Sequence, residues 1–265
     1  MALHIIVCVK VVPKPEEVRV DPNTRTLDRA KARSEINPPD MNALEAALRL
    51  RDEHGGRVSL ISMGPPFAED YLRLTLAMGA DHGYLLSDRA FGGADTLATS
   101  YTLAQGIRKI GPFDIILCGE ESSDGATAQV PPGIAEWLGI SQITYAMGLW
   151  VAGDKLRGQR ELRGGHEVIE VPLPAVASIK VGINEPRFID FDRWAWAREE
   201  GRVTVWGVQD LDVDPEMIGL PGSPTVVAGL GQAAATGERR REFIGGSPDE
   251  AAQALFKKIK DLLPV

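Results

Sequence analysis

The chain has 265 residues, with 29 lysines and arginines against 37 aspartates and glutamates, which gives a formal net charge of -8. Its 44% hydrophobic and 25% charged residues are typical of a globular protein and exclude a wholly disordered or collagen-like chain. The acidic balance argues against non-specific binding to nucleic acid, because attraction to phosphates needs a basic surface. It leaves room for a nucleotide held by backbone amides.

The two cysteines, Cys8 and Cys118, form neither a CxxC pair nor a cluster with histidines at metal-ligand spacing. We therefore expect no disulfide and no zinc site. The apolar run at the N-terminus is too short to cross a bilayer and lacks signal-peptide features, and no other run reaches the length of a membrane span. These features predict a reduced, cytoplasmic protein without direct membrane insertion.

Four short, continuously apolar segments predict buried strands of a parallel sheet covered on both faces. They are Ile5–Val9, Val58–Met63, Gly83–Leu86 and Phe113–Cys118. Helix patterns alternate with them near residues 41–48, 71–78, 97–107 and 134–138. This alternation predicts a doubly wound, mostly parallel, Rossmann-like α/β fold.

Three regions depart from the alternation. Residues 18–28 alternate around a turn sequence and predict a small hairpin after the first strand. Closely spaced β patterns predict antiparallel additions to the sheet, at residues 143–151, 155–161, 167–171 and 175–180. Residues 206–246 are rich in Gly, Pro, Asp and Ala without periodicity, which predicts an extended C-terminal arm.

An amphipathic helix that begins at Ser247, with Leu255 and Ile259 on its apolar side, ends the arm. With nothing of its own to pack on, it indicates a partner surface. The alternative is that arm and helix fold back on the chain's own sheet. The expected organisation is thus an α/β domain at residues 1–205 and an arm with its helix at residues 206–265.

Ligands of doubly wound sheets bind beyond the carboxyl ends of the strands, so the loops that follow the strands form the candidate site. The segment Gly119–Val130 follows a buried strand and opens a helix, and its small residues let backbone amides approach a phosphate. Asp124 suits a helix N-cap or an acceptor for ribose or ring N–H groups. A plain capped turn without a ligand is the alternative, because the sequence is neither GxGxxG nor a Walker loop.

Two more loops end at the same edge of the predicted sheet. Asp95 and Thr96 follow Gly92 and Gly93, where a flat ring could approach the backbone, although helix capping alone would explain both polar residues. Asn37 is held extended before a proline and could turn its amide to this edge, with capping again the alternative. Together these loops predict a nucleotide-binding site.

Six stretches of the sequence carry a family resemblance: Cys8–Pro13, Asn37–Leu48, Asp88–Thr96, Asp124–Val130, Asn184–Arg187 and Gly246–Ala252. Taken in order, they resemble the beta subunit of electron transfer flavoprotein. The resemblance implies a heterodimer with an alpha subunit that carries its own FAD and that the arm embraces. Ordinary members hold AMP in the beta pocket, whereas electron-bifurcating members hold a second FAD that accepts hydride from NADH. The Asp88–Thr96 stretch resembles the bifurcating group and favours FAD.

The resemblance also assigns roles to residues. It implies an adenosine pocket lined by Val9, Asn37, Asp40 and Met63, a flavin ring beside Asp95 and Thr96, and phosphates and a ribityl chain held by Asp124, Gly125, Ala126, Thr127, Ala128, Gln129 and Val130. A partner-docking loop is implied at Ile183, Asn184, Glu185, Pro186 and Arg187. Its partner would be an acyl-CoA or other dehydrogenase or a quinone reductase, with ferredoxin as a further acceptor. The stretch Asp192–Glu200 replaces the usual lysine-rich helix, which weakens the expectation of a dehydrogenase.

Two other classes of nucleotide-binding protein are alternatives to this family. A universal-stress-type nucleotide-binding regulator would share the sheet and the phosphate turn but would need neither the arm nor a flavin. An ATP-pyrophosphatase-type ligase would need a Ser-Gly-Gly-x-Asp-Ser loop after the first strand, and residues 10–14 do not supply it.

Overall fold

The computed structural model describes residues 2–14, 19–20, 27–28, 33–226 and 243–262. Contacts divide the chain into two compact units, residues 1–228 and 229–265. The division lies later in the chain than the boundary at residue 205 that the sequence suggested.

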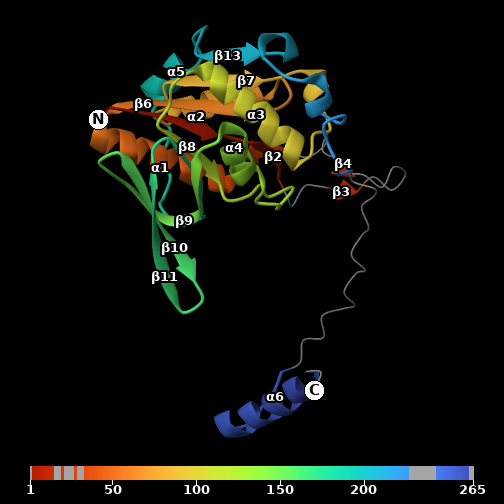
Figure 1. Ribbon diagram of the computed structural model, residues 1–265. Coiled ribbons are helices and arrows are strands. Elements are labelled where there is room, and N and C mark those ends of the chain that lie inside the picture. Colours follow the sequence, from red (N-terminus) through yellow and green to blue (C-terminus); the bar gives the residue numbers. More distant parts are fainter. Residues whose placement is uncertain (1, 15–18, 21–26, 29–32, 227–242, 263–265) are drawn as a thin grey trace. The chain divides into compact units, whose positions relative to one another are not determined.

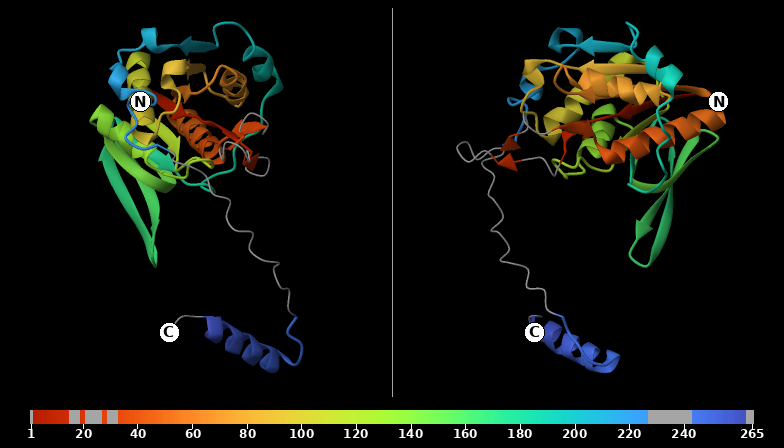
Figure 2. Two further views of the ribbon diagram at one scale, coloured as in Figure 1. Left: turned by 90° about the vertical axis from the view of Figure 1, so that its right-hand side faces the viewer. Right: turned by 180° about the vertical axis from the view of Figure 1, so that it is seen from behind.

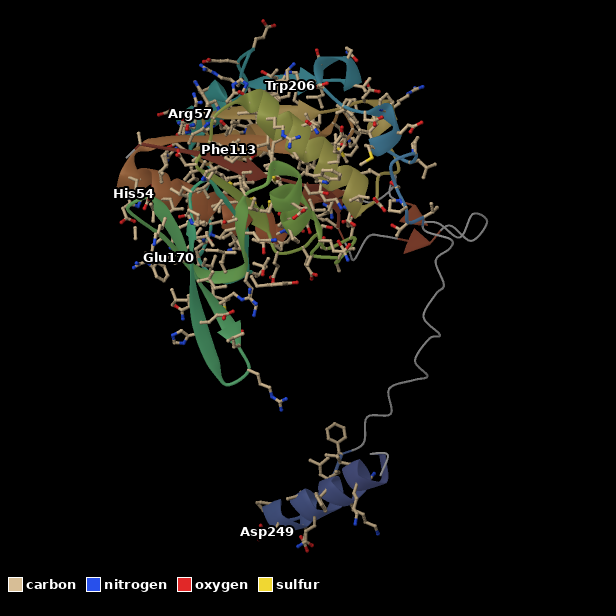
Figure 3. All side chains as sticks on the ribbon, in the orientation of Figure 1. His54, Arg57, Phe113, Glu170, Trp206 and Asp249 are labelled. Carbon is tan, nitrogen blue, oxygen red and sulfur yellow. The ribbon has the colours of Figure 1, made fainter. Side chains whose placement is uncertain are left out.

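A nine-stranded sheet forms the centre of the first unit, in the order β11-β10-β9-β12-β8-β1-β6-β7-β13 (Figure 1). The strands are β1 (Leu3–Cys8), β6 (Gly56–Met63), β7 (His82–Leu86), β8 (Ile115–Gly119), β9 (Ser141–Ala152), β10 (Lys155–Leu162), β11 (Gly165–Pro172), β12 (Ala175–Ile179) and β13 (Val203–Trp206). In this spatial order, every neighbouring pair on the β9-β12-β8-β1-β6-β7-β13 side is parallel. The pairs β11–β10 and β10–β9 are antiparallel. Glu170 on β11 and Trp206 on β13 mark the two edges of the sheet (Figure 3).

Helices cover both faces of the sheet (Figure 2). One face carries α1 (Pro38–His54), α2 (Ala68–Ala77) and α5 (Phe191–Trp196), and the other carries α3 (Thr96–Ile110) and α4 (Val130–Leu138). Successive side chains of a strand point to opposite faces, so Ile5 and Val7 of β1 pack under α1 while Ile6 and Cys8 pack under α3 and α4. The doubly wound, mostly parallel α/β prediction is confirmed.

The small hairpin predicted after the first strand is also present, as β3 (Arg19–Val20) paired with β4 (Leu27–Asp28). A second two-stranded ribbon, β2 (Val11–Pro13) with β5 (Ser34–Ile36), was not predicted. Neither was the edge strand β13. The segment Ala175–Lys180 was expected among the antiparallel additions, and this was wrong. Its strand β12 runs parallel between β8 and β9, and all five of its residues are buried, as in the other central strands.

Residues 207–226, expected as the start of an arm, pack against the α3 face. Leu211 and Ile218 are buried in the core there, and the Tyr101 hydroxyl of α3 accepts a hydrogen bond from the Asp214 amide at 2.9 Å. Two short 3-10 turns, η3 (Val208–Asp210) and η4 (Pro215–Met217), shape this segment. Lacking periodicity, it folds through scattered apolar anchors rather than as a helix or strand.

The second unit contains α6 (Pro248–Leu262). Three of its large apolar side chains are exposed: Leu255 at 50%, Phe256 at 69% and Ile259 at 46%. Among the helices in the described part of the chain, none is both long enough and apolar enough to span a membrane.

Replacing Ile218 by alanine tests whether residues 207–226 belong to the folded core. Ile218 is 3% exposed, so we expect a loss of about 2–4 kcal/mol in the free energy of unfolding, measured by urea denaturation. Phe243→Ala is the control, because its side chain is 94% exposed and should change stability by less than about 0.5 kcal/mol. Equal effects of the two substitutions would contradict the packing described above.

Candidate functional site

The strand order reverses between β1 and β8. From β1 the chain passes through α1 to β6 and then β7 on one side, whereas β8 returns to the other side of β1. In open α/β sheets such a switch point leaves a crevice beyond the carboxyl ends of the two strands. The loops after β1 and β8, which begin at Val9 and at Glu120, meet there. We call the carboxyl ends of β1 and β8 with their loops the switch-point rim.

The buried carboxylate of Asp40, in the first turn of α1, ties the rim together. Its Oδ2 accepts the Lys10 amide at 2.7 Å, and its Oδ1 accepts the Gly119 amide and the Asn37 side-chain amide, both at 3.1 Å. A Cβ on Gly119 would overlap Asp40 and Pro39, so only glycine permits this approach. Burial raises the pKa of Asp40 to about 7, although the amides of Lys10, Asn37 and Gly119 oppose the rise.

Asn37 links α1 to the loop after β8. Its side-chain nitrogen donates to the Glu121 carbonyl at 2.9 Å, and its side-chain oxygen accepts the Ser123 amide at 3.1 Å. Its side chain makes no capping hydrogen bond to α1, so capping does not explain this residue. Asn37 therefore fixes where the 121–123 stretch lies.

Asp124 does not cap a helix. It forms an ion pair with Lys10 at 2.6 Å, and α4 begins only at Val130, with Gln129 in the N-cap position. Of the two roles expected for Asp124, that of helix cap is therefore wrong. Two prolines near the start of α4 explain the late start, since proline favours the first turn of a helix.

Because of those prolines, the backbone N–H groups without acceptors lie just before α4 rather than in its first turn. Pro131 and Pro132 have no N–H, and the Gly133 amide donates to the Gln129 carbonyl at 3.0 Å. The amides of Thr127, Ala128 and Gln129, just before α4, find no acceptor among the described residues.

The backbone around these amides takes an unusual form. Ala126 and Ala128 have positive φ angles of 46° and 55°, and Gln129 returns to the right-handed region. Successive residues of opposite hand make their N–H groups converge, which is the arrangement of an anion-binding nest. Positive φ is uncommon for alanine and occurs preferentially at functional sites.

The start of α3 joins the same rim. The Thr96 hydroxyl donates to the Gln129 side-chain oxygen at 3.0 Å. Asp95 caps α3 by accepting the amides of Leu97 and Ala98, and its other oxygen accepts the Thr225 amide at 3.1 Å and hydroxyl at 2.7 Å. Its carboxylate therefore has four donors. The structure therefore places Asp95 and Thr96 beside Gln129, one of the residues predicted to hold phosphate.

Val9 is the first residue after β1 and Met63 is the last residue of β6, and their side chains pack on opposite faces of the sheet. Val9 is 4% exposed in the core under α1, and the partly buried Met63 packs against the core under α3. Val9 donates its amide to Ile61 at 2.8 Å, which continues the β1–β6 pairing to the edge of the rim.

The predicted docking loop is fastened to α1. Asn184 and Asn42 exchange side-chain hydrogen bonds with each other's backbone carbonyls at 3.0 and 2.8 Å, and the Arg187 guanidinium pairs with Glu45 at 2.8 Å. Burial raises the pKa of Glu45, but hydrogen bonds from Arg187 and Arg49 lower it, and the pKa lies below its usual value. Glu185 and Pro186 are the exposed tip of this loop, and Phe188 beyond it is 96% exposed.

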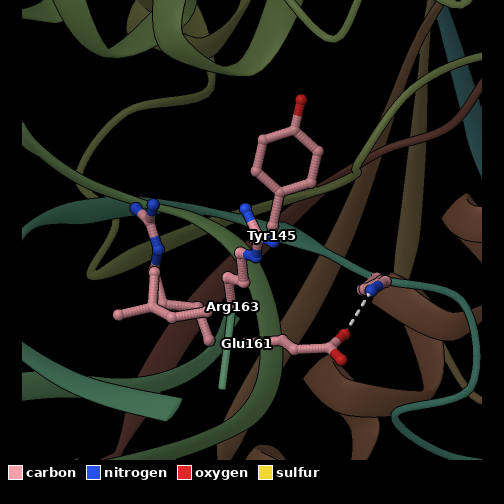
Figure 4. A pocket seen from close by; sticks show the side chains of 6 residues that line it. Tyr145, Glu161 and Arg163 are labelled. Atoms are coloured by element: carbon pink, nitrogen blue, oxygen red, sulfur yellow. Dashed lines mark hydrogen bonds and ion pairs between the residues drawn. The ribbon is translucent and has the colours of Figure 1, made fainter. Parts of the chain in front are cut away.

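Two hollows are lined by residues other than those described above. One of about 350 Å³ is lined by residues of β9, of the end of β10 with the turn after it, and by the residue that follows β12: Tyr145, Arg160, Glu161, Leu162, Arg163 and Lys180 (Figure 4). Another of about 520 Å³ includes Arg57 and Phe113 and lies at the amino ends of the strands. Switch-point topology, rather than the size of a hollow, therefore locates the candidate site.

Sequence reasoning missed three contributors to the rim: Lys10, Ser123 and Thr225. Each acts through a partner more than 80 positions away in the chain, so local patterns could not assign them. Lys10 carried one usable signal, a positive charge directly after a buried strand.

Comparison with known proteins supports the same interpretation. Residues 24–211 match the Electron transfer flavoprotein domain. The chain belongs to the electron transfer flavoprotein family. It is 45% identical to the electron transfer flavoprotein subunit beta of Clostridium acetobutylicum, over 98% of each chain. It is 43% identical to the caffeyl-CoA reductase-Etf complex subunit CarD of Acetobacterium woodii, over 98% of each, and 42% identical to protein FixA of Azorhizobium caulinodans, over 97% of this chain and 95% of that one. The resemblance noted in the sequence is confirmed.

In this electron transfer flavoprotein chain, Asp40→Asn should lower the free energy of unfolding by about 1–3 kcal/mol, because an NH₂ group replaces an acceptor opposite a buried donor. The folded pKa of about 7 lies above the ordinary 3.8, so the folded state holds the proton more tightly than the unfolded state. The contribution of Asp40 to stability therefore falls as pH rises through this window.

Urea denaturation of both forms between about pH 4 and pH 7 measures this effect. The stability difference between wild type and Asp40→Asn should shrink as pH rises. Asp212→Asn, at an exposed position, is the control and should differ from wild type by less than about 0.5 kcal/mol throughout. A difference that grows with pH would contradict the raised pKa.

Proposed function

We propose that this chain is the beta subunit of a heterodimeric electron transfer flavoprotein and that its switch-point rim holds the phosphate of an adenine-containing cofactor. The observation that carries the proposal is the row of amides at Thr127, Ala128 and Gln129, which lack acceptors among the described residues. Their position after β8, beside the positive end of the α4 dipole, suits an anion.

The other rim residues support this site in different ways. Asp40 and Asn37 are 6% and 1% exposed, so they would shape the adenosine pocket chiefly by fixing its walls. Val9 and Met63 would form its floor at the strand ends. Gly125 through Val130 would hold phosphate, with Gln129 fixed by Thr96.

FAD is the favoured cofactor of this pocket, and AMP is the alternative. The Asp88–Thr96 stretch resembles that of bifurcating members, and the relative CarD carries the name of a reductase-Etf complex subunit. A bound flavin would supply the electron acceptance and transfer, with NADH as donor. Burial raises the pKa of Asp95, but hydrogen bonds from Thr225 and the α3 amides lower it, and the pKa lies below its usual value. A carboxylate charge held at Asp95 would make it less favourable for a flavin ring nearby to take up electrons.

The proposed partners follow from the exposed surfaces. The alpha subunit, with its own FAD, would meet the arm and the exposed apolar side chains of α6. A dehydrogenase or quinone reductase, with ferredoxin as a further acceptor, would meet the tip of the loop from Ile183 to Arg187. A cytoplasmic setting fits the two free cysteines, which persist in reducing compartments.

Cofactor content tests this proposal. The chain is co-expressed with its proposed alpha subunit, and the purified complex is denatured for mass analysis of released nucleotides. We expect about two FAD per heterodimer, because the rim and the alpha subunit would each hold one. One FAD with one AMP would support the non-bifurcating alternative. A complex with no adenine nucleotide beyond the alpha-subunit FAD would contradict the proposed rim site.

The positive φ of Ala128 gives a second test. Ala128→Val should weaken binding of AMP by about tenfold, because a β-branched residue strains this conformation, whereas Ala128→Gly should stay within about twofold of wild type. Isothermal titration calorimetry measures both. Ala252→Val, on the exposed side of α6, is the control. Equal affinities for all forms would show that the loop backbone does not contact the ligand.

A further inference from the structure

The loop proposed to hold phosphate is itself acidic. Residues 119–130 contain Glu120, Glu121 and Asp124 and no lysine or arginine. Carboxylates this close to a phosphate would repel it unless their charge is offset. The rim therefore needs positive charge from another part of the chain.

Lys10 supplies that charge. Its ammonium lies 2.6 Å from an Asp124 oxygen and donates to the Ser122 hydroxyl at 3.2 Å. The Asp124 side chain is 8% exposed and the Lys10 side chain 45%, so the ion pair has its carboxylate inside and its ammonium partly open. The third N–H of the ammonium has no acceptor among the described residues.

Both ends of this ion pair are fixed to the same scaffold. The Lys10 amide donates to Asp40, and the Gly119 amide at the root of the loop donates to the same carboxylate. Within the loop, the Ser122 carbonyl accepts the Gly125 and Ala126 amides at 3.2 and 2.8 Å, which closes a tight turn. Lys10 holds this turn at Ser122 and Asp124, immediately before the amides that lack acceptors.

We propose that Lys10 is a positioning residue for the anionic end of the cofactor: its ammonium offsets negative charge at Asp124 and fixes the 122–126 turn, so that a phosphate meets backbone N–H groups beside an ion-paired carboxylate. This inference rests on the proposed function and deepens it. It predicts discrimination by charge, because the same contact does little for an uncharged nucleoside.

AMP and adenosine are the probes, titrated calorimetrically into the full-length chain freed of nucleotide. We expect Lys10→Gln to weaken AMP binding by about tenfold and adenosine binding by less than about twofold, and to flatten the salt dependence of AMP binding. Lys10→Arg, which keeps the charge, should bind AMP within about threefold of wild type. The double variant Lys10→Gln with Asp124→Asn should recover part of the loss, because it also removes the negative charge that Lys10 offsets.

Lys155→Gln is the matched control, since Lys155 is also ion-paired, with Glu170, but on the antiparallel extension. It should bind both probes as wild type does. Equal losses of AMP and adenosine affinity in Lys10→Gln would assign Lys10 a merely structural role and overturn the inference, as would unchanged AMP affinity. A wild-type chain that binds neither probe would overturn the proposed function as well, so the two failures are distinguishable.

Discussion

One buried carboxylate, that of Asp40, determines the geometry of the switch-point rim. It receives N–H groups from the end of β1, the end of β8 and the start of α1. Two parallel strands and a helix are thereby fixed at one point, within hydrogen-bond length. Everything proposed for the rim depends on this junction, because the loops after β1 and β8 leave from it.

The junction has a physical cost that the surrounding residues offset. Moving a carboxylate out of water is unfavourable, and burial accordingly raises the pKa of Asp40. Three donors stabilise its charged form, and Gly119 lets the β8 backbone come close enough to be one of them. An apolar pair could pack here as well, but it would not specify which amides point where. Directional hydrogen bonds therefore explain why a polar group occupies so buried a place.

The regular part of the fold was predictable because its signals are local. Continuous apolar runs such as Ile5–Val9 identified the buried strands, and glycines such as Gly139 identified helix ends. Strand β12 was misassigned because its short distance from β11 resembles a hairpin, whereas its five buried residues belong to the sheet centre. The rim was predicted only as a set of loops. Asp124 meets Lys10 across 114 positions, and Asp95 meets Thr225 across 130, and no local pattern reports such pairs.

The same long-range pairs explain how an acidic chain can offer a site for an anion. Three carboxylates near the rim are directed to donors: Asp95 to Thr225 and the start of α3, Asp124 to Lys10, and Glu120 to the Val181 amide at 3.1 Å. The amides of residues 127–129 are left as donors without partners among the described residues. An incoming phosphate therefore encounters oriented N–H dipoles, while these three carboxylates are already paired with donors. Net charge, a property of the whole surface, does not decide what binds at the rim; the local pairing of each carboxylate does.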